Sequence, residues 1–129
     1  YGQTALPQHI RDSDQQTTVI VQIETALSVE NISEIAKVPG VDALFVGRAD
    51  LAVSYGVDAI THPRVQAAVE RVCEVAKEHG RPLGIFLPNT AEIDAFTALG
   101  FTFFVIGSDQ SMLKSGANQI SIPLPTGQR

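Results

Sequence analysis

The sequence holds a single cysteine, Cys73, among its 129 residues. One cysteine allows no disulfide within the chain, so we expect a reducing compartment, most simply the cytoplasm. No apolar run approaches the roughly 20 residues that a transmembrane helix needs, and the polar N-terminal residues lack a secretory signal pattern. Basic residues are also few: nine Lys and Arg against fourteen Asp and Glu give a net charge of −5. That charge argues against nucleic acid or an anionic membrane as a partner.

The composition that remains is that of an ordinary globular protein, 44% hydrophobic and 18% charged. The length suggests one domain, 1–129, too short for the core of a full barrel enzyme. Within it we expect a polar segment over 1–18, β-α units over 19–109, and a C-terminal helix or tail over 110–129, its end irregular. Because the chain begins at Tyr1 rather than Met, we expect a fragment or a processed product.

Four short apolar runs predict β-strands, at 19–23, 41–47, 82–87 and 101–107. The first run is continuous and β-branched, which is typical of a strand buried on both faces of a parallel sheet.

Apolar residues at helical spacing predict the segments between the strands. A helix is expected from Ser28 to Pro39-Gly40, and a short one from Asn89 or Thr90 to Gly100 with Ile93, Phe96 and Leu99 inward. A long helix is expected from Pro63 to Gly80. Its predicted buried face comprises Val65, Ala68, Val69, Val72, Val75 and Ala76. Residues 48–61 are predicted to form a loop.

The order β-α-β-α-β-α-β predicts a parallel sheet with right-handed crossovers. Residues 40–47 and 100–107 have similar sequences, and each stretch is followed shortly by an aspartate. Four strands alone would leave two apolar edges open, which proteins avoid. We therefore predict the fold class as α/β, the C-terminal half of a (β/α)8 TIM barrel, with the other half upstream.

Two carboxylates follow two of these strands: Glu24 after the first and Asp50 after the second. In a β-α barrel the active site lies at the carboxyl ends of the strands. Mg²⁺ takes one or two carboxylates together with substrate oxygens and waters. Gln22 shares a strand face with Glu24, and a turn into a helix after Gly47 would aim N–H groups at a bound carboxylate. On spacing alone, it is equally open that both acids only cap helices.

The residues around these acids resemble the HpcH/HpaI aldolase family of metal-dependent 2-oxo acid aldolases, in the superfamily of the citrate lyase beta subunit. The likeness covers about residues 19–115, and its two most specific stretches read VQIET at 21–25 and VPGVDALFVGRADLA at 38–52. It continues through His62-Pro63, 84–86 and 105–109.

The resemblance implies a set of roles for the residues of this chain. Glu24 and Asp50 would bind Mg²⁺ or Mn²⁺, Gln22, Ala49 and Asp50 would contact a pyruvate-like substrate, and Phe86 would line the aldehyde pocket. The metal would stabilise a pyruvate enolate, which adds to an aldehyde or is released when a 4-hydroxy-2-oxo acid is cleaved. A homo-oligomer, trimer or hexamer, is implied as well.

Two departures from the family pattern matter. Arg48 stands where the family usually has Pro, which either adds a cation near the metal or points a charge into solvent. The catalytic His and the substrate-gripping Arg of the family lie in the first half of the barrel, so the catalytic residues of this chain stay unknown. Two alternatives remain open: an acyl-CoA lyase of the citrate lyase beta type, which needs basic residues for phosphates, or a non-catalytic half-barrel.

Other reactive residues fit structural roles better. No lysine is placed on a strand as a Schiff-base aldolase requires, and Cys73 lies beside the apolar stripe of the long helix. His62 reads as a helix entry. Tyr55 could close over the site or simply pack, and Ser108-Asp109 could cap the last helix or take part in the site.

Overall fold

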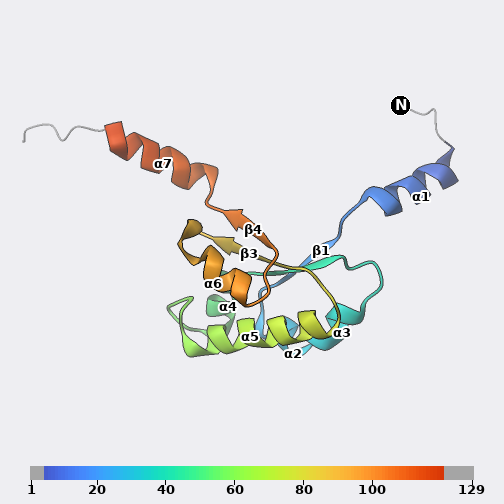
Figure 1. Cartoon of the computed structure of the whole chain (residues 1–129), viewed down its shortest axis with the longest axis horizontal. Helices are drawn as coiled ribbons and strands as arrows, with labels where there is room; N and C mark the ends of the chain where they lie inside the picture. Colours follow the sequence, from blue (N-terminus) through green and yellow to red (C-terminus); the bar gives the residue numbers. More distant parts are fainter. Residues whose placement is uncertain (1–4, 121–129) are drawn as a thin grey trace, which may run out of the picture.

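The computed structural model describes residues 5–120 (Figure 1). Its centre is one sheet of four strands, β1 (Ile20–Ile23), β2 (Ala43–Val46), β3 (Leu83–Leu87) and β4 (Phe103–Ile106). All neighbouring strands are parallel, and the order is β1-β2-β3-β4. The predicted β-α alternation and parallel sheet are therefore confirmed, with each strand somewhat shorter than its apolar run.

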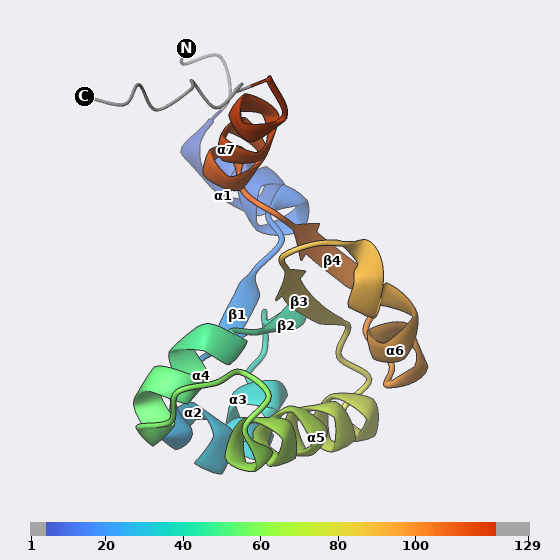
Figure 2. The ribbon, with the colours of Figure 1, turned by 90° about the vertical axis from the view of Figure 1, so that its left-hand side faces the viewer.

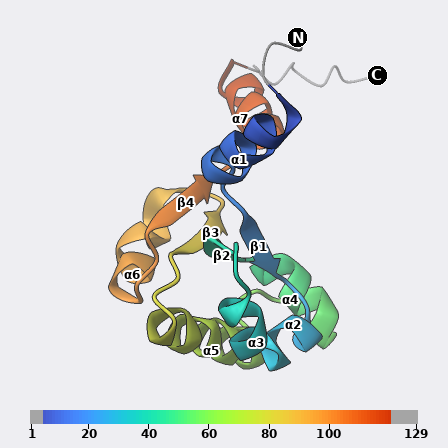
Figure 3. The same cartoon turned by 90° about the vertical axis from the view of Figure 1, so that its right-hand side faces the viewer.

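The helices between the strands cover one face of the sheet, and one further helix lies at each end of the described part. They are α1 (Leu6–Gln16), α2 (Ala26–Glu30), α3 (Ile32–Lys37), α4 (Arg48–Tyr55), α5 (Pro63–Glu78), the 3-10 helix η1 (Thr90–Glu92), α6 (Ile93–Ala98) and α7 (Asp109–Ile120). Figure 2 shows α2 to α5 beneath the sheet and α6 beside β4, while α1 and α7 extend away in the opposite direction. Figure 3 shows the same arrangement from the other side. The layers are those of about four β-α units of a TIM barrel.

The core lies between the sheet and this helical layer. Alternate strand residues point to opposite faces, and those directed at the helices, such as Ile23, Leu44 and Ile85, are fully buried. The buried residues of α5 are the six that the sequence predicts: Val65, Ala68, Val69, Val72, Val75 and Ala76. Burial of each large apolar side chain contributes roughly 1.5–3 kcal/mol, so this layer holds the described fold together.

The opposite face of the sheet carries exposed apolar side chains. Ile20, Phe86 and Val105 retain 49%, 43% and 49% of their accessible surface. The prediction that the first strand is buried on both faces was therefore wrong, because helices cover one face only among residues 5–120. On this open face the rings of Phe45 and Phe103 lie 6.0 Å apart.

The segment predicted as a loop over 48–61 begins instead as α4. Leu51 and Ala52 of this helix are buried, so core packing favours the helix where local sequence favoured a loop. Gly56 ends it in a left-handed conformation, with φ +65°, that glycine adopts without strain.

Two other helix predictions need correction. Thr25, not Ser28, is the N-cap of α2: Thr25 Oγ1 accepts from the Ser28 N–H at 3.1 Å, and Ser28 Oγ accepts in return from the Thr25 N–H at 3.0 Å. The helix breaks at Asn31 into α2 and α3. Leu99, expected to point inward, is 50% exposed, whereas Phe96 is buried.

Several local signals were read correctly. His62 Nδ1 accepts from the Arg64 N–H and caps α5 ahead of Pro63, and Asn89 Oδ1 accepts from the Ala91 N–H. Residues 110–120 belong to α7, and residues 121–129, where the irregular end is expected, lie outside the described part. Among residues 5–120, no helix has the length and apolar character needed to cross a membrane.

Candidate metal and substrate site

The two predicted acids lie at the same end of the sheet. Glu24 directly follows β1, and Asp50 lies in the first turn of α4, four residues after β2 ends. The Gly47 N–H donates to the Ile23 carbonyl at 3.1 Å, so β1 and β2 stay paired up to this point. The parallel pairing therefore brings Glu24 and the start of α4 to one edge, as parallel strands require.

Gly47 lies at the point where the predicted polar side chains converge. A Cβ on this residue would stand 3.0 Å from Gln22 Nε2, 3.0 Å from Glu24 Cβ and 3.4 Å from Asp50 Oδ2. Its φ of −98° is open to any residue, so the requirement for glycine comes from this crowding and not from the backbone. The missing side chain leaves the room in which Gln22, Glu24 and Asp50 meet.

Gln22 is directly hydrogen-bonded to one of the acids. Its Nε2 donates to Glu24 Oε2 at 2.6 Å. A hydrogen bond to a charged acceptor is among the stronger kinds in proteins. Gln22 thus orients the carboxylate of Glu24.

The N-terminus of α4 supplies backbone donors beside the acids. The first hydrogen bond of the helix runs from the Leu51 N–H to the Gly47 carbonyl at 2.9 Å, so the N–H groups of Ala49 and Asp50 precede the helical ladder. Gly47 offers them no side-chain cap. These amides, at the positive end of the helix dipole, suit the carboxylate of a small substrate.

A cavity of about 430 Å³ opens over these groups. Gln22, Ala49 and Asp50 border it, together with an apolar wall of Phe45, Ile60, Phe86, Pro88 and Val105. Phe86, expected from the resemblance to line an aldehyde pocket, borders this cavity, and its role there stays a prediction. The cavity joins polar groups at the ends of β1 and β2 to apolar side chains on β3 and β4, a combination typical of small-molecule sites.

Sequence reasoning missed several of these apolar residues. Val105 pairs in register with Phe86, so the two-residue period of β4 could have identified it. Phe45 of β2 lies on the same open face of the sheet as Phe86 and Val105 and could have been found in the same way. Ile60 lies in the connection between α4 and α5, and no pattern in the sequence points to it.

Other candidate residues lie elsewhere. Tyr55 packs at the edge of the core, with the Arg64 guanidinium 4.7 Å from its ring centre. Ser108 and Ser111 form a reciprocal cap at the start of α7, and neither Ser108 nor Asp109 borders the cavity. Burial raises the pKa of the Cys73 thiol to about 11, which agrees with packing and not with a nucleophile. Of the described residues 5–120, the cavity is bordered by no lysine or histidine.

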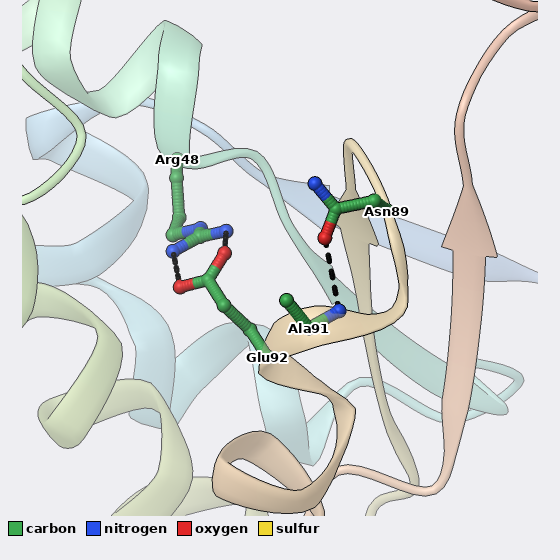
Figure 4. A network of polar contacts seen from close by, with 4 residues as sticks. All are labelled: Arg48, Asn89, Ala91 and Glu92. Atoms are coloured by element: carbon green, nitrogen blue, oxygen red, sulfur yellow. Dashed lines mark hydrogen bonds and ion pairs between the residues drawn. The ribbon is translucent and has the colours of Figure 1, made fainter.

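Arg48 is one of the residues that border this cavity, and of the two positions expected for its charge, the one in solvent is wrong. It is only 8% exposed, so it does not point into solvent, and its guanidinium pairs with Glu92 of η1 (Figure 4). Hydrogen bonding to Arg48 holds the pKa of the Glu92 carboxyl below its usual value.

The donor set suits a hard divalent cation. Among residues 5–120, no group of three or more His, Cys, Asp and Glu gathers into a metal-binding cluster. The candidate ligands at these strand ends are therefore two carboxylates, Glu24 and Asp50. Mg²⁺ is commonly held by one or two carboxylates, with waters and substrate oxygens completing the shell. Capping alone does not explain Glu24, since Thr25 caps α2. Glu24 Cβ and Asp50 Oδ2 both lie beside the space over Gly47, and of the two acids Asp50 borders the cavity while Glu24 does not.

A sequence model of the family described as HpcH/HpaI aldolase/citrate lyase matches residues 3–116. A relative named 5-keto-4-deoxy-D-glucarate aldolase, from Enterobacter sp. (strain 638), is 37% identical over 117 residues, which are 90% of this chain and 46% of that protein. A relative of the same name from Salmonella arizonae shows the same identity and coverage. The chain thus spans about half the length of the curated relatives it matches.

Solved structures show the same likeness. An HpcH/HpaI aldolase/citrate lyase family protein from Burkholderia cenocepacia J2315 is 38% identical, with a TM-score of 0.79 over 87% of this chain and 44% of that one. The citrate lyase beta subunit from M. tuberculosis, solved with oxaloacetate and magnesium, shares the fold, at 17% identity and a TM-score of 0.60 over 83% of this chain and 53% of that one.

Proposed function

Because the chain belongs to the HpcH/HpaI aldolase/citrate lyase family, we propose that it carries the metal and pyruvate site of a divalent-metal-dependent aldolase. The reaction would cleave or form 4-hydroxy-2-oxo acids through a pyruvate enolate, as for 2-dehydro-3-deoxyglucarate or 4-hydroxy-2-oxoheptanedioate. The observation that carries this proposal is the meeting of Gln22, Glu24 and Asp50 around Gly47.

Each residue has a distinct task in this proposal. Glu24 and Asp50 hold Mg²⁺ or Mn²⁺, and Gln22 keeps the Glu24 carboxylate in place through its 2.6 Å hydrogen bond. The cation, when bound, supplies a Lewis acid that stabilises negative charge on the oxo acid. The N–H groups of Ala49 and Asp50 bind the substrate carboxylate at the start of α4.

The apolar wall gives the second half of the site. Phe86 and Val105, on adjacent strands, bound the cavity on the side away from the acids. They exclude water from the region where the enolate carbon meets an aldehyde, and they leave room for the aldehyde substituent. Arg48 is among the cavity residues, but its guanidinium is bound to Glu92, so in this proposal the group that removes the C3 proton and the arginine that polarises the carbonyl come from outside residues 5–120.

The acyl-CoA lyase alternative has less support. A coenzyme A thioester requires cations for its phosphates, and Arg48 is the basic residue at these strand ends. Its guanidinium is already bound to both carboxylate oxygens of Glu92, which leaves it poorly placed to bind phosphate.

The test is solvent exchange of the C3 protons of pyruvate, followed by NMR in D₂O with the full-length protein. We expect exchange with Mn²⁺ or Mg²⁺ present and its loss on adding EDTA. Absence of exchange at saturating metal would reject the aldolase and favour the non-catalytic half-barrel. A cytoplasmic location and a trimer or hexamer remain predictions that fractionation and sedimentation can check.

A further inference from the structure

Arg48, the first residue of α4, is the one buried charged side chain of residues 5–120, with 8% of its surface exposed. Its two terminal nitrogens donate to the two carboxylate oxygens of Glu92, at 3.1 and 2.9 Å (Figure 4). A bidentate pair of this kind fixes orientation as well as distance. Glu92 ends η1, just after β3, so the pair joins the start of α4 to the neighbouring β-α connection.

Phe96 supports the guanidinium from α6. The Arg48 Cζ lies 4.7 Å from the centre of its ring, and that ring is held edge-on against Phe101 at 5.2 Å. The Nε atom of Arg48 is buried and has no hydrogen-bond partner among the described residues. The side chain therefore depends on Glu92 for its hydrogen bonds, and loss of that carboxylate would leave a buried cation unpaired.

The position of Arg48 in the chain links this pair to the candidate site. Its backbone lies between Gly47, which leaves room for the acids, and Ala49-Asp50, whose amides and carboxylate border the cavity. The first turn of α4 has no side-chain cap. The Gly47 N–H bond to the Ile23 carbonyl and the buried side chain of Leu51 hold this turn against β1 and the core, and the Arg48–Glu92 pair is the side-chain ion pair that ties it to the β3-α6 connection.

We propose that Arg48 and Glu92 form a clamp that positions the first turn of α4, and with it the amides that bind the substrate carboxylate. The proposal rests on the proposed function for its ligand, while the clamp itself is a property of the free chain. Arg48 acts here as a positioning residue, since its charge is neutralised by Glu92 and is not directed at the ligand.

The variants separate the ion pair from packing. Glu92→Gln keeps the size of the side chain and removes its charge, and Arg48→Met keeps an apolar stem over Phe96 without the donors. Glu74→Gln is the matched control, because it breaks the exposed Arg71–Glu74 pair of α5, which is distant from the first turn of α4 along the chain and has little expected effect.

Two measurements on the full chain test the clamp. The first is hydrogen exchange of the Leu51 and Ala52 amides without ligand, which we expect to be about tenfold faster in Glu92→Gln and unchanged in Glu74→Gln. The second is pyruvate binding to the Mn²⁺-loaded protein, followed by water-proton relaxation. We expect it to weaken about tenfold in each clamp variant, and the double variant to be no worse than the singles. Mn²⁺ affinity should change less, since the Asp50 side chain can readjust while its amide cannot.

The outcomes distinguish the two proposals. If the Leu51 and Ala52 amides exchange no faster in Glu92→Gln than in Glu74→Gln, the clamp is overturned. It is also overturned if the clamp variants lose Mn²⁺ and pyruvate affinity equally, and only in proportion to the loss of folded protein. If wild-type protein binds neither Mn²⁺ nor pyruvate, the proposed function fails and the clamp loses its role in the site. Faster exchange together with selective loss of pyruvate binding supports both.

Discussion

Gln22 Nε2 lies 2.6 Å from Glu24 Oε2, so two residues on the same face of one strand end are joined before any ligand arrives. A carboxylate that is already oriented loses less freedom when it binds a cation. The site at the ends of β1 and β2 is thus partly organised by the protein itself.

Gln22→Leu keeps a similar size and removes this hydrogen bond. We expect Mn²⁺ affinity to fall about tenfold, within the range seen when groups that orient metal ligands are lost. Titration by water-proton relaxation measures it, with Gln66→Leu on the exposed side of α5 as control. Unchanged Mn²⁺ affinity in Gln22→Leu would mean that Glu24 either is no ligand or needs no orientation.

Asp50→Ala should abolish Mn²⁺ binding and metal-dependent proton exchange while leaving the fold intact. Asp50 is exposed, so its loss removes a ligand without opening a cavity in the core, and only a small dipole contribution to α4 disappears. Asp58→Ala, in the following connection, is the matched control. Circular dichroism and the Mn²⁺ titration together give the answer, and activity comparable to wild type at saturating metal would refute the assignment.

Gly84→Ala should destabilise the fold by about 1–3 kcal/mol, the usual range for overpacking. A Cβ at Gly84 would lie 2.0 Å from the Phe103 ring, which has to move. Urea denaturation measures the loss, and a second change, Phe103→Leu, should recover part of it. An unshifted urea midpoint for Gly84→Ala alone would show that the ring moves aside freely.

Cys73 should react slowly with a disulfide reagent at about pH 8. Burial, and then the charge of Glu70, raise the pKa of its thiol from 9.0 to about 11. The fraction of thiolate is then about 100-fold lower than for an unperturbed cysteine. The rate should rise as pH approaches 11 and reach the free-cysteine value in urea. Fast labelling of the folded chain at neutral pH would contradict the raised pKa.

The Arg48–Glu92 pair should lose its contribution to stability in acid. The pKa of Glu92 is lowered from its usual 4.5 by the hydrogen bond from Arg48. A lowered carboxyl pKa gives stability that is present above the unfolded value and disappears as pH falls through the folded value. The difference in urea midpoint between wild type and Glu92→Gln should therefore be full at neutral pH and disappear as pH falls below 4.5 and through the lowered pKa of Glu92. A difference that does not depend on pH would indicate packing as its source.

Much of the fold follows from local patterns. The six buried residues of α5, the caps at His62 and Asn89, and the alternation of strands and helices could all be read because each depends on neighbours within a turn or on burial against one surface. Gly40 and Gly100 both adopt positive φ, at +88° and +99°. The similarity between residues 40–47 and 100–107 therefore includes the same backbone conformation before each strand. That Glu24 and Asp50 lie at the same edge could be predicted because parallel strands end at one edge, while their role as metal ligands stays a prediction.

Other features depended on contacts between distant segments. Helix α4 replaced a predicted loop because Leu51 and Ala52 find a core to enter, and Ile20 and Phe86 are exposed because no helix covers their face among residues 5–120.

Arg48 shows the difference between sequence and tertiary structure most clearly. The sequence marked it as a cation beside the site, but its partner Glu92 lies 44 residues away. Residue types and spacing determined which groups stand at the strand ends. Only the packing of η1 and α6 against α4 decided which of them meet, because ion pairs and cavities depend on distances in space that no local pattern encodes.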